Sequence, residues 1–307
     1  MSSSVRLGKI IKAFNEARGE HRELPRLCII GEGPEYVRAI DVLSISAAWV
    51  PNGAGAPLDA LPVSGLTPSA RLFAPYDVVI FVASGTRGRD IAPLVQAARA
   101  GGRQIVALLG STQEAGWARA AGVSVDETAR GLGPDARGRG TLEQRIVRAA
   151  DHGAATLAAH MPAVRRVYCD HIILANAKQN GVIGVVVIIP GADMPAMTAN
   201  QIRMVLQIAA AYGEEIGLDR ALEILSVVGS AFAFRALARQ ALVFVPGFGW
   251  ALKGAIGFSA TMALGKAAVA YFDVGAPLQV SHVKRIEHQV ERVRNKLPGF
   301  AQRASDS

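Results

Sequence analysis

The residue types best suited to chemistry in this sequence are glycines and hydroxyl residues that directly follow short apolar runs. Two such loops stand out: Ser84, Gly85, Thr86 and Arg87 form the first, and Gly110, Ser111 and Thr112 form the second. Backbone amides and hydroxyl groups of this kind bind anions when a helix amino terminus follows them. The sequence therefore predicts a candidate site for a phosphorylated ligand, although the same residue types also make ordinary turns and helix caps.

A third glycine loop, Gly31-Glu32-Gly33-Pro34, resembles a nucleotide-binding turn only superficially. A phosphate loop needs a lysine and a hydroxyl residue after its last glycine, whereas Tyr36, Val37 and Arg38 stand there. The dinucleotide pattern fails as well, because its third glycine would fall at Tyr36. We interpret this loop as a plain strand-to-helix turn and expect no hydrolysis of GTP or ATP.

The histidines of the middle of the chain do not have the spacing of metal ligands. His152 and His160 are eight residues apart, a little over two helical turns, and His171 follows later. The neighbouring Asp151, Cys169 and Asp170 do not complete a ligand pattern, and Cys28 is the only other cysteine. We therefore predict no metal, no cofactor, no disulfide and no catalytic residue.

The length and composition of the chain indicate a globular protein with two domains. The 307 residues suffice for two cores, and the 32 glycines and the aromatic share of 6% indicate close packing between small residues. Lysine and arginine outnumber aspartate and glutamate by 33 to 25 without concentrating in one segment. This distribution argues against a nucleic-acid partner and leaves anionic lipid, an acidic partner or plain solubility open.

Residues 23–130 alternate apolar runs with helical patterns, which predicts an α/β domain with a Rossmann-like parallel sheet. Strands are expected at 27–31, 77–83 and 104–109, with shorter ones at 45–50 and 123–125, and helices at 34–43, 89–100 and 113–121. The segment 52–68 has the composition of a loop, and residues 1–22 that of an amphipathic helix.

A glycine-rich linker at 131–140 predicts a boundary, after which the pattern is that of an all-α domain over 141–278. Helices are expected at 141–160, 164–179, 198–212, 218–228, 231–243 and 250–272, followed by a basic helix and tail at 279–307. Thr141 with Gln144 and Thr198 with Gln201 match the capping-box spacing, and Gly213 is a helix stop.

Two apolar stretches distinguish this helical domain. The first has twelve uncharged residues, Gly181–Ala192, before Asp193, and is shorter than the roughly 20 residues of a membrane span. It suits a re-entrant hairpin, a buried strand or a buried helix. The second, 241–272, is interrupted only by Lys253 and Lys266.

Small residues recur in the second stretch at Gly257, Thr261 and Gly265, which places them on one face of a helix. Such a face lets another backbone approach closely. In lipid it is a helix-association seam, and in water it is a tight bundle contact or a homo-oligomer contact. The sequence leaves both alternatives open.

One pattern in this half is similar to a known family. It consists of Pro190, Asp193, Gln201, Met204, Ile208, Ala209, Tyr212 and Gly213, then Pro246, Gly247, Phe248 and Gly249 and a helix carrying Gly257 and Gly265 up to Tyr271. Over residues 145–273 the chain resembles the YcjF-like bacterial domain of unknown function. The resemblance implies a helical domain fused to, or encoded with, a GTPase, often in a membrane protein, and it supplies no catalytic residue.

The same resemblance implies a degenerate G-domain for residues 25–130. The chain departs from a working G-domain because it lacks the phosphate-loop lysine. It also carries Gly110-Ser111-Thr112-Gln113 where the guanine-reading Asn-Lys-x-Asp motif would stand. Any GTPase ancestor has therefore lost its hydrolytic parts.

These observations lead to two expectations for function. The first is a non-enzymatic adaptor or scaffold at the cytoplasmic side of a membrane, with lipid, a GTPase or a second copy of the chain as partner. Its two hairpins would have tips at Pro190-Gly191 and Pro246-Gly247. The alternative is a soluble cytoplasmic enzyme or sensor that binds a phosphorylated ligand at the hydroxyl loops of the first domain.

Overall fold

The computed structural model describes residues 24–44, 57–82, 88–110, 114–132, 140–186, 194–214 and 249–273. It has an α/β part followed by a helix-rich part, as the sequence predicts. Contacts divide the chain into two compact units, which we describe separately. The α/β unit comprises Ile11–Leu174 and Leu206–Ile216, and the helical unit comprises Met1–Ile10, Ala175–Val205 and Gly217–Ser307. The predicted linker at 131–140 falls inside the first unit.

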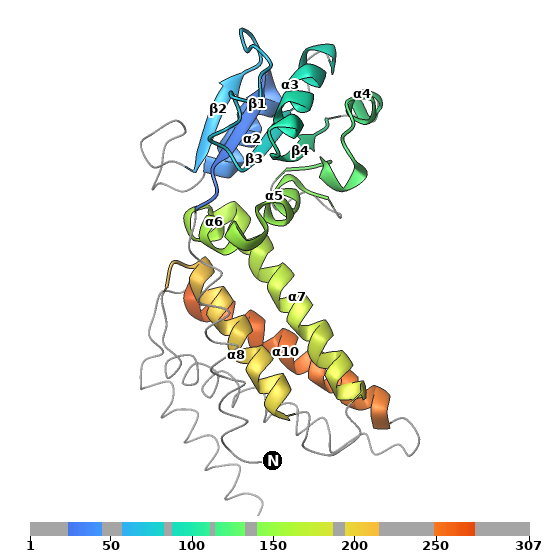
Figure 1. The fold of residues 1–307 in the computed structure, drawn as a ribbon. Helices are drawn as coiled ribbons and strands as arrows, with labels where there is room; N and C mark the ends of the chain where they lie inside the picture. Colours follow the sequence, from blue (N-terminus) through green and yellow to red (C-terminus); the bar gives the residue numbers. More distant parts are fainter. Residues whose placement is uncertain are drawn as a thin grey trace, which may run out of the picture. The chain divides into compact units, whose positions relative to one another are not determined.

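The α/β unit is built on a five-stranded parallel sheet (Figure 1). Its strands are β1 (Leu27–Gly31), β2 (Leu58–Pro62), β3 (Val78–Val82), β4 (Gln104–Leu108) and β5 (Thr128–Ala129). The order β2-β1-β3-β4-β5 is that of the flavodoxin-like doubly wound sheets. The predictions for β1, β3 and β4 are confirmed, because apolar runs buried on both faces give a clear signal.

Two predictions at the edges of the sheet are wrong. β2 lies inside the segment 52–68, for which the composition predicts a loop. It is an edge strand, paired with β1 on one side, and Leu58 is its one fully buried residue. The last strand is β5, whereas residues Val125–Glu127 form a short 3-10 helix and Val125 is 78% exposed. The predicted strand at 45–50 lies outside the described residues.

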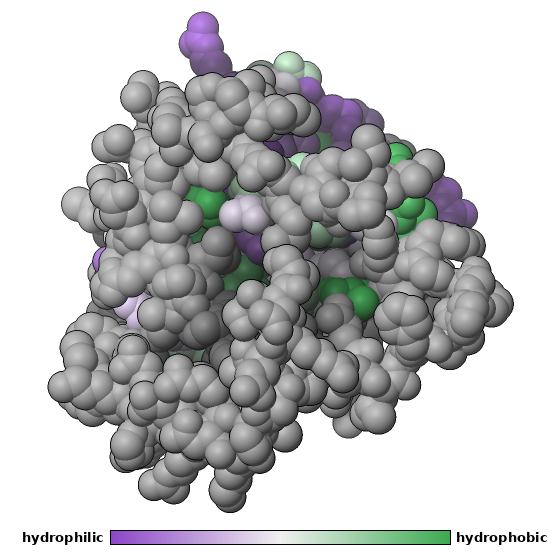
Figure 2. All heavy atoms as spheres, turned by 90° about the horizontal axis from the view of Figure 1, so that it is seen from below, coloured by the Kyte–Doolittle hydropathy of each residue, from purple (hydrophilic) through white to green (hydrophobic). Residues whose placement is uncertain are grey.

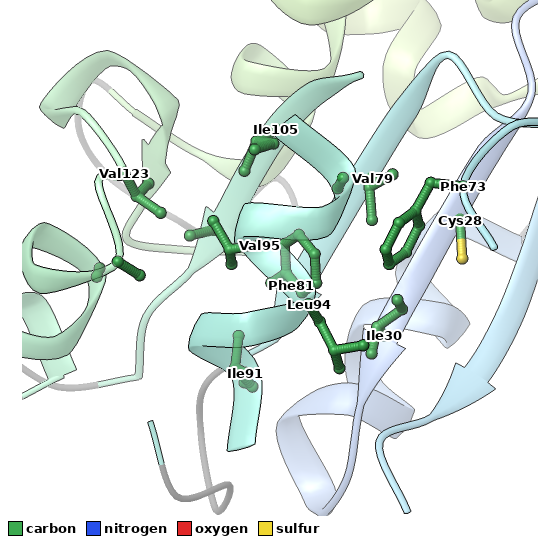
Figure 3. Close-up of a cluster of buried hydrophobic side chains, with 14 of the residues drawn as sticks. Cys28, Ile30, Phe73, Val79, Phe81, Ile91, Leu94, Val95, Ile105 and Val123 are labelled. Atoms are coloured by element: carbon green, nitrogen blue, oxygen red, sulfur yellow. The ribbon is translucent and has the colours of Figure 1, made fainter. Parts of the chain in front are cut away.

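Helices cover both faces of this sheet. α3 (Gly88–Ala100) and α4 (Glu114–Ala120) pack on one face, where the buried cluster of Figure 3 includes Phe73 and Phe81 with their rings edge to face at 6.3 Å. α2 (Pro34–Ser44) belongs to the opposite face by the right-handed rule for parallel crossovers. α5 (Leu142–Ala150) contacts β4 and β3, so this helix packs on the sheet although the sequence assigns it to the helical domain.

The predicted helix over 141–160 is interrupted in the structure. α5 ends at Ala150, because the φ of 43° at Asp151 leaves the helical region, and a 3-10 turn leads into α6 (Ala154–His160). The cap prediction at Thr141 is confirmed, since its Oγ1 accepts from the Gln144 amide. Gln144 Oε1 in turn accepts from the Gly140 amide at 2.7 Å, one residue earlier than in a strict capping box.

The remaining described helices are α7 (Pro162–Val186), α8 (Met194–Ala211) and α10 (Gly249–Asp273). α7 extends beyond the predicted 164–179. The prediction of a helix cap at Thr198 is wrong, because α8 begins at Met194. Pro195 lies in the first turn of α8, where the missing amide hydrogen of proline costs no hydrogen bond. Gly213 does stop α8: its φ is 77° and the Glu214 amide donates to the Ala209 carbonyl. The predicted helices at 218–228 and 231–243 lie outside the described residues.

Candidate functional site

The carboxyl edge of the parallel sheet is the first candidate site, because the chain leaves β1 and β3 there on opposite sides. Open α/β sheets bind ligands at such a switch point. Of the residues that the sequence singles out for this edge, Gly110 follows β4 and is exposed. The others lie outside the described residues: Ser84, Gly85, Thr86, Arg87, Ser111 and Thr112.

At Gly31 the ends of β1 and β3 lie close together at this edge. A Cβ placed at Gly31 would lie 2.8 Å from the Cβ of Val82 and 2.9 Å from Cδ2 of Tyr36. Burial raises the pKa of the Tyr36 hydroxyl, so the ring stays neutral near pH 7. The backbone of Gly31 therefore packs directly against the neighbouring strand and the first turn of α2.

A carboxylate lies beside the same edge. Glu32 Oε1 accepts a hydrogen bond of 2.7 Å from the amide of Ser64. A carboxylate here opposes an anionic ligand. The described part of the edge thus contains a turn at Gly31 and the carboxylate of Glu32. Anion binding there would depend on the loops 84–87 and 110–112.

The amino edge of the sheet carries a polar cluster that the sequence does not predict. Arg26 Nη2 donates to Asp59 Oδ2 at 2.9 Å, and the guanidinium lies 5.4 Å from the centre of the Tyr76 ring. Burial, followed by a hydrogen bond to Asp59, raises the pKa of Tyr76. Burial, followed by the charge of Asp59, raises the pKa of Cys28 to about 12. These groups tie β1, β2 and the start of β3 together and leave the thiol inert.

The helical unit contains a buried polar network to which each of its described helices contributes. Asn180 of α7 donates from Nδ2 to Thr261 Oγ1 of α10 at 2.8 Å, and its Oδ1 accepts from Asn200 Nδ2 of α8 at 2.9 Å. Asn200 Nδ2 also donates to the Asn176 carbonyl, and the Thr261 hydroxyl donates to the Gly257 carbonyl. We call Asn180, Asn200 and Thr261 the buried triad.

Backbones approach closely beside this triad. A Cβ at Gly257 would lie 2.8 Å from the Asn180 carbonyl oxygen, and one at Gly254 would lie 2.9 Å from the Gly181 carbonyl oxygen. Thr261 is 0% exposed and Gly265 is buried. The close approach expected from the spacing of Gly257, Thr261 and Gly265 is present at Gly257, between α7 and α10. Gly254 extends this seam by one helical turn.

The contacts also fix the direction of the helices. Val185 lies against Gly254, whereas Asn180 lies against Gly257 and Thr261, so α7 and α10 run antiparallel. Asn180 Nδ2 points at the Met197 carbonyl while Asn200 reaches back to Asn176, so α8 is also antiparallel to α7. The end of α7 and the starts of α8 and α10 therefore meet at one end of the unit (Figure 1). We call residues 181–186, 194–199 and 249–258 the apolar end.

The helical unit buries apolar and polar side chains together, and at its apolar end it exposes valines. Its buried triad consists of polar side chains, while Val182 is 61% and Val186 67% exposed. In the view from below, a few separate hydrophobic residues of the described part of the chain are visible in green (Figure 2). Among the described residues, the helix Gly254–Asp273 has the length and composition to cross a membrane, and 22% of its most apolar window is buried.

The residues that carry the family resemblance fall into both units. Gln201 Nε2 lies 3.4 Å from Thr261 Oγ1 in the helical unit. In the α/β unit the ring of Tyr212 lies 4.8 Å from the guanidinium of Arg165, which also donates to the carbonyls of Ala158 and Ala159 at the end of α6. Gly249 begins α10. Pro190, Asp193, Pro246 and Gly247 lie outside the described residues.

His152 and His160 each lie close to a neighbouring residue of their own segment. His152 Nε2 is 3.4 Å from Asp151 Oδ2 on the surface, and His160 Nδ1 is 2.9 Å from the Thr156 carbonyl. In the part of the chain that the structure describes, no group of three histidine, cysteine or acidic side chains is placed to hold a metal ion.

Comparisons with protein-family models, with curated proteins and with solved structures find no match for this chain. The inference of function therefore rests on the geometry of the sheet edge and of the helical unit.

Proposed function

We propose that this chain is a non-enzymatic adaptor that binds a membrane through the apolar end of its helical unit. The observation that supports this most is the combination of a buried polar triad with exposed valines at that end. Asn180, Asn200 and Thr261 satisfy one another inside, as hydrocarbon requires of polar groups that have no water to bind. The side chains that face outward at the same end are Val182, Val185 and Val186.

The energetic balance favours lipid around this end. Full burial of one valine side chain is worth about 1.5–3 kcal/mol relative to exposure. An exposed aliphatic face costs this free energy in water and gains it in hydrocarbon. Helix association in lipid relies on small residues and interhelical hydrogen bonds, and Gly254, Gly257 and the buried triad provide both.

The α/β unit is the part of the adaptor that would meet a protein partner. The resemblance to the YcjF-like domain supports a GTPase as that partner and the cytoplasmic face of a membrane as the location. Both cysteines, Cys28 and Cys169, are free and buried, which fits a reducing compartment.

The exposed valines provide the sharpest test of membrane binding. Val182→Gln with Val186→Gln removes the outward aliphatic face without touching the buried triad, and should reduce the vesicle-bound fraction of the full chain by tenfold or more. Ala175→Gln is the matched control, because Ala175 is exposed on the same helix but beyond the apolar end. Equal binding of the wild type, the double variant and the control would contradict the proposal.

A second candidate function is the binding of a phosphorylated small molecule at the carboxyl edge of the sheet. The strand order places a switch point there, and Gly31 lets β1 and β3 approach closely. Ser84→Ala with Thr86→Ala should then weaken binding of nucleotides or sugar phosphates at least tenfold without unfolding the chain. A calorimetric screen of phosphate, nucleotides and sugar phosphates that gives no heat would exclude this candidate.

A further inference from the structure

We infer that the carboxy-terminal segment 279–296 packs as a helix along the outward face of α7 and leaves this face when the chain binds a membrane. The packing is independent of the proposed function, whereas the release rests on the proposed membrane binding. Residues 279–296 lie outside those that the structure describes. Three features point to this occupant: the spacing of its apolar residues, a charge beside them and the length of chain that leads to it.

The outward face of α7 carries exposed residues at heptad spacing. They follow one another at steps of three, four and three residues, and we call them the α7 stripe: Ala175, Lys178, Val182 and Val185. Val185 also lies against Gly254, so the stripe borders the existing contact between α7 and α10. A heptad stripe of this kind is the surface on which a second helix packs.

The carboxy-terminal segment has the same spacing. Its apolar residues also follow at steps of three, four and three: Val283, Ile286, Val290 and Val293. Each lies 108 positions after a residue of the α7 stripe, since 283 minus 175 and 293 minus 185 are both 108. In one parallel register all four therefore face their counterparts, with Val290 opposite Val182 and Val293 opposite Val185.

A charge on the segment complements the one polar residue of the α7 stripe. Lys178 stands opposite Ile286 in this register, and Glu287 borders that position. An ion pair between Lys178 and Glu287 keeps the ammonium group satisfied at the seam. A lysine at such a position also lowers the stability of a helix pair, which suits a contact that has to open. The outer positions of the segment are basic: Lys284, Arg285 and Arg292.

The length of the chain permits this arrangement. From Thr261 of the buried triad to Asp273, α10 rises about 18 Å away from the apolar end. A helix parallel to α7 must start at that far end and return towards the apolar end. In the register above, Gln279 lies about 14 Å from the level of the triad on the same side. The six steps from Asp273 to Gln279 span up to about 20 Å, and packed helix axes lie about 8–10 Å apart.

The position of the segment gives it a role in membrane binding. It covers Val182 and Val185 in water but does not reach the parts of the apolar end on α8 and α10. At a membrane, hydrocarbon takes its place on α7, and the basic outer surface of the segment is attracted to anionic headgroups. The segment thus competes with lipid for the same valines.

Cysteine cross-linking in the full chain tests the packing. Val182→Cys with Val290→Cys places two thiols opposite each other, whereas Val182→Cys with Val283→Cys is seven residues, about 10 Å, out of register. Cys28 and Cys169 are buried, so the wild-type chain is the blank. Chains are diluted from detergent until they no longer meet and are treated with a short bifunctional thiol reagent. The matched pair should link within one chain about tenfold faster than the shifted pair, as mass spectrometry of the peptides would show.

Other occupants of the α7 stripe give different results in the same experiment. Links between two chains would assign the stripe to a second copy. Faster linking of Val182→Cys to Ile11→Cys than to Val290→Cys would assign it to the amphipathic segment 1–22. Either result, or equal rates for the matched and the shifted pair, would overturn the packing.

A charge exchange tests the register. Lys178→Glu should slow the linking of the matched pair about threefold, because it places a carboxylate beside Glu287. Adding Glu287→Lys should restore the rate. Loss of linking in both variants would overturn the pairing of Lys178 with Glu287 and the register that depends on it.

Vesicles of phosphatidylcholine and phosphatidylglycerol test the release. Chains that float with the vesicles should link the matched pair about fivefold more slowly than chains in buffer. An unchanged rate in floating chains would overturn the release and leave the proposed membrane binding intact. Chains that link in register but do not float would support the packing and contradict the proposed membrane binding.

Discussion

The side-chain amide of Asn180 donates a hydrogen bond of 2.8 Å to the hydroxyl of Thr261, a residue 81 positions farther along the chain. This bond joins α7 to α10, and Asn200 of α8 donates from its Nδ2 to Oδ1 of the same Asn180 amide group. Polar atoms thus hold the inside of the helical unit together, while valines face outward at its apolar end.

Asn180→Leu should destabilise the helical unit by about 1–3 kcal/mol, because it removes one of the two acceptors of the Asn200 amide and breaks the bond to Thr261. Thermal unfolding of the full chain in mild detergent, followed by far-UV circular dichroism, measures the change. Gln179→Leu, the exposed neighbour, should stay within about 0.5 kcal/mol of the wild type. A wild-type transition for Asn180→Leu would show that the network contributes no stability.

Gly257→Ala should also destabilise the helical unit, by about 1–3 kcal/mol, since the new Cβ would lie 2.8 Å from the Asn180 carbonyl oxygen. Gly116→Ala is the matched control in another helix: nothing lies within 4 Å of its Cβ position, so alanine should stabilise the α/β unit by about 0.5–1 kcal/mol. Denaturant titration monitors both variants. Equal shifts of the same sign would mean that the seam is not tightly packed.

The α/β unit should lose stability at alkaline pH. The pKa of Cys28 is raised to about 12 in the folded chain, and that of Tyr76 is raised as well. An unfolded thiol ionises at about 8.5, so the unfolded state releases its proton first and is stabilised relative to the folded state as the pH rises. The contribution of Cys28 is fully present below pH 8.5 and declines towards pH 12. Ellman's reagent should find no reactive thiol in the native chain at pH 8 and two after denaturation. Rapid native labelling would contradict the burial.

The purified chain should hydrolyse neither GTP nor ATP. Tyr36, whose ring packs against Gly31, stands among the residues where a phosphate loop needs its lysine and hydroxyl. Release of inorganic phosphate in the presence of magnesium should equal the buffer blank. Turnover above the blank that disappears in Gly31→Ala or Gly33→Ala would refute this expectation.

Local periodicity predicts the centre of the α/β unit well and its edges poorly. β3 is the run VVIFV, and its burial on both faces leaves no other interpretation. β2 is the run LDALP, whose composition is that of a loop because an edge strand needs apolar residues only where it meets β1. β5 has two residues, too few to produce a pattern.

In the helical unit the sequence predicts the seam but not its partner. The spacing of Gly257, Thr261 and Gly265 indicates a face that another backbone can approach. The approaching backbone belongs to Asn180 and Gly181. Helical periodicity does not encode this contact, because the residues involved are far apart in the chain. The buried triad escapes prediction for the same reason.

Flotation of the full chain with anionic vesicles tests the central claim most directly. The wild-type chain should rise with the vesicles in a density gradient and remain bound after a high-salt wash, because apolar burial is not screened by salt whereas surface charge attraction is. Without vesicles it should need detergent to remain monodisperse. A monodisperse chain that stays at the bottom of the gradient with vesicles present would contradict the membrane-binding account.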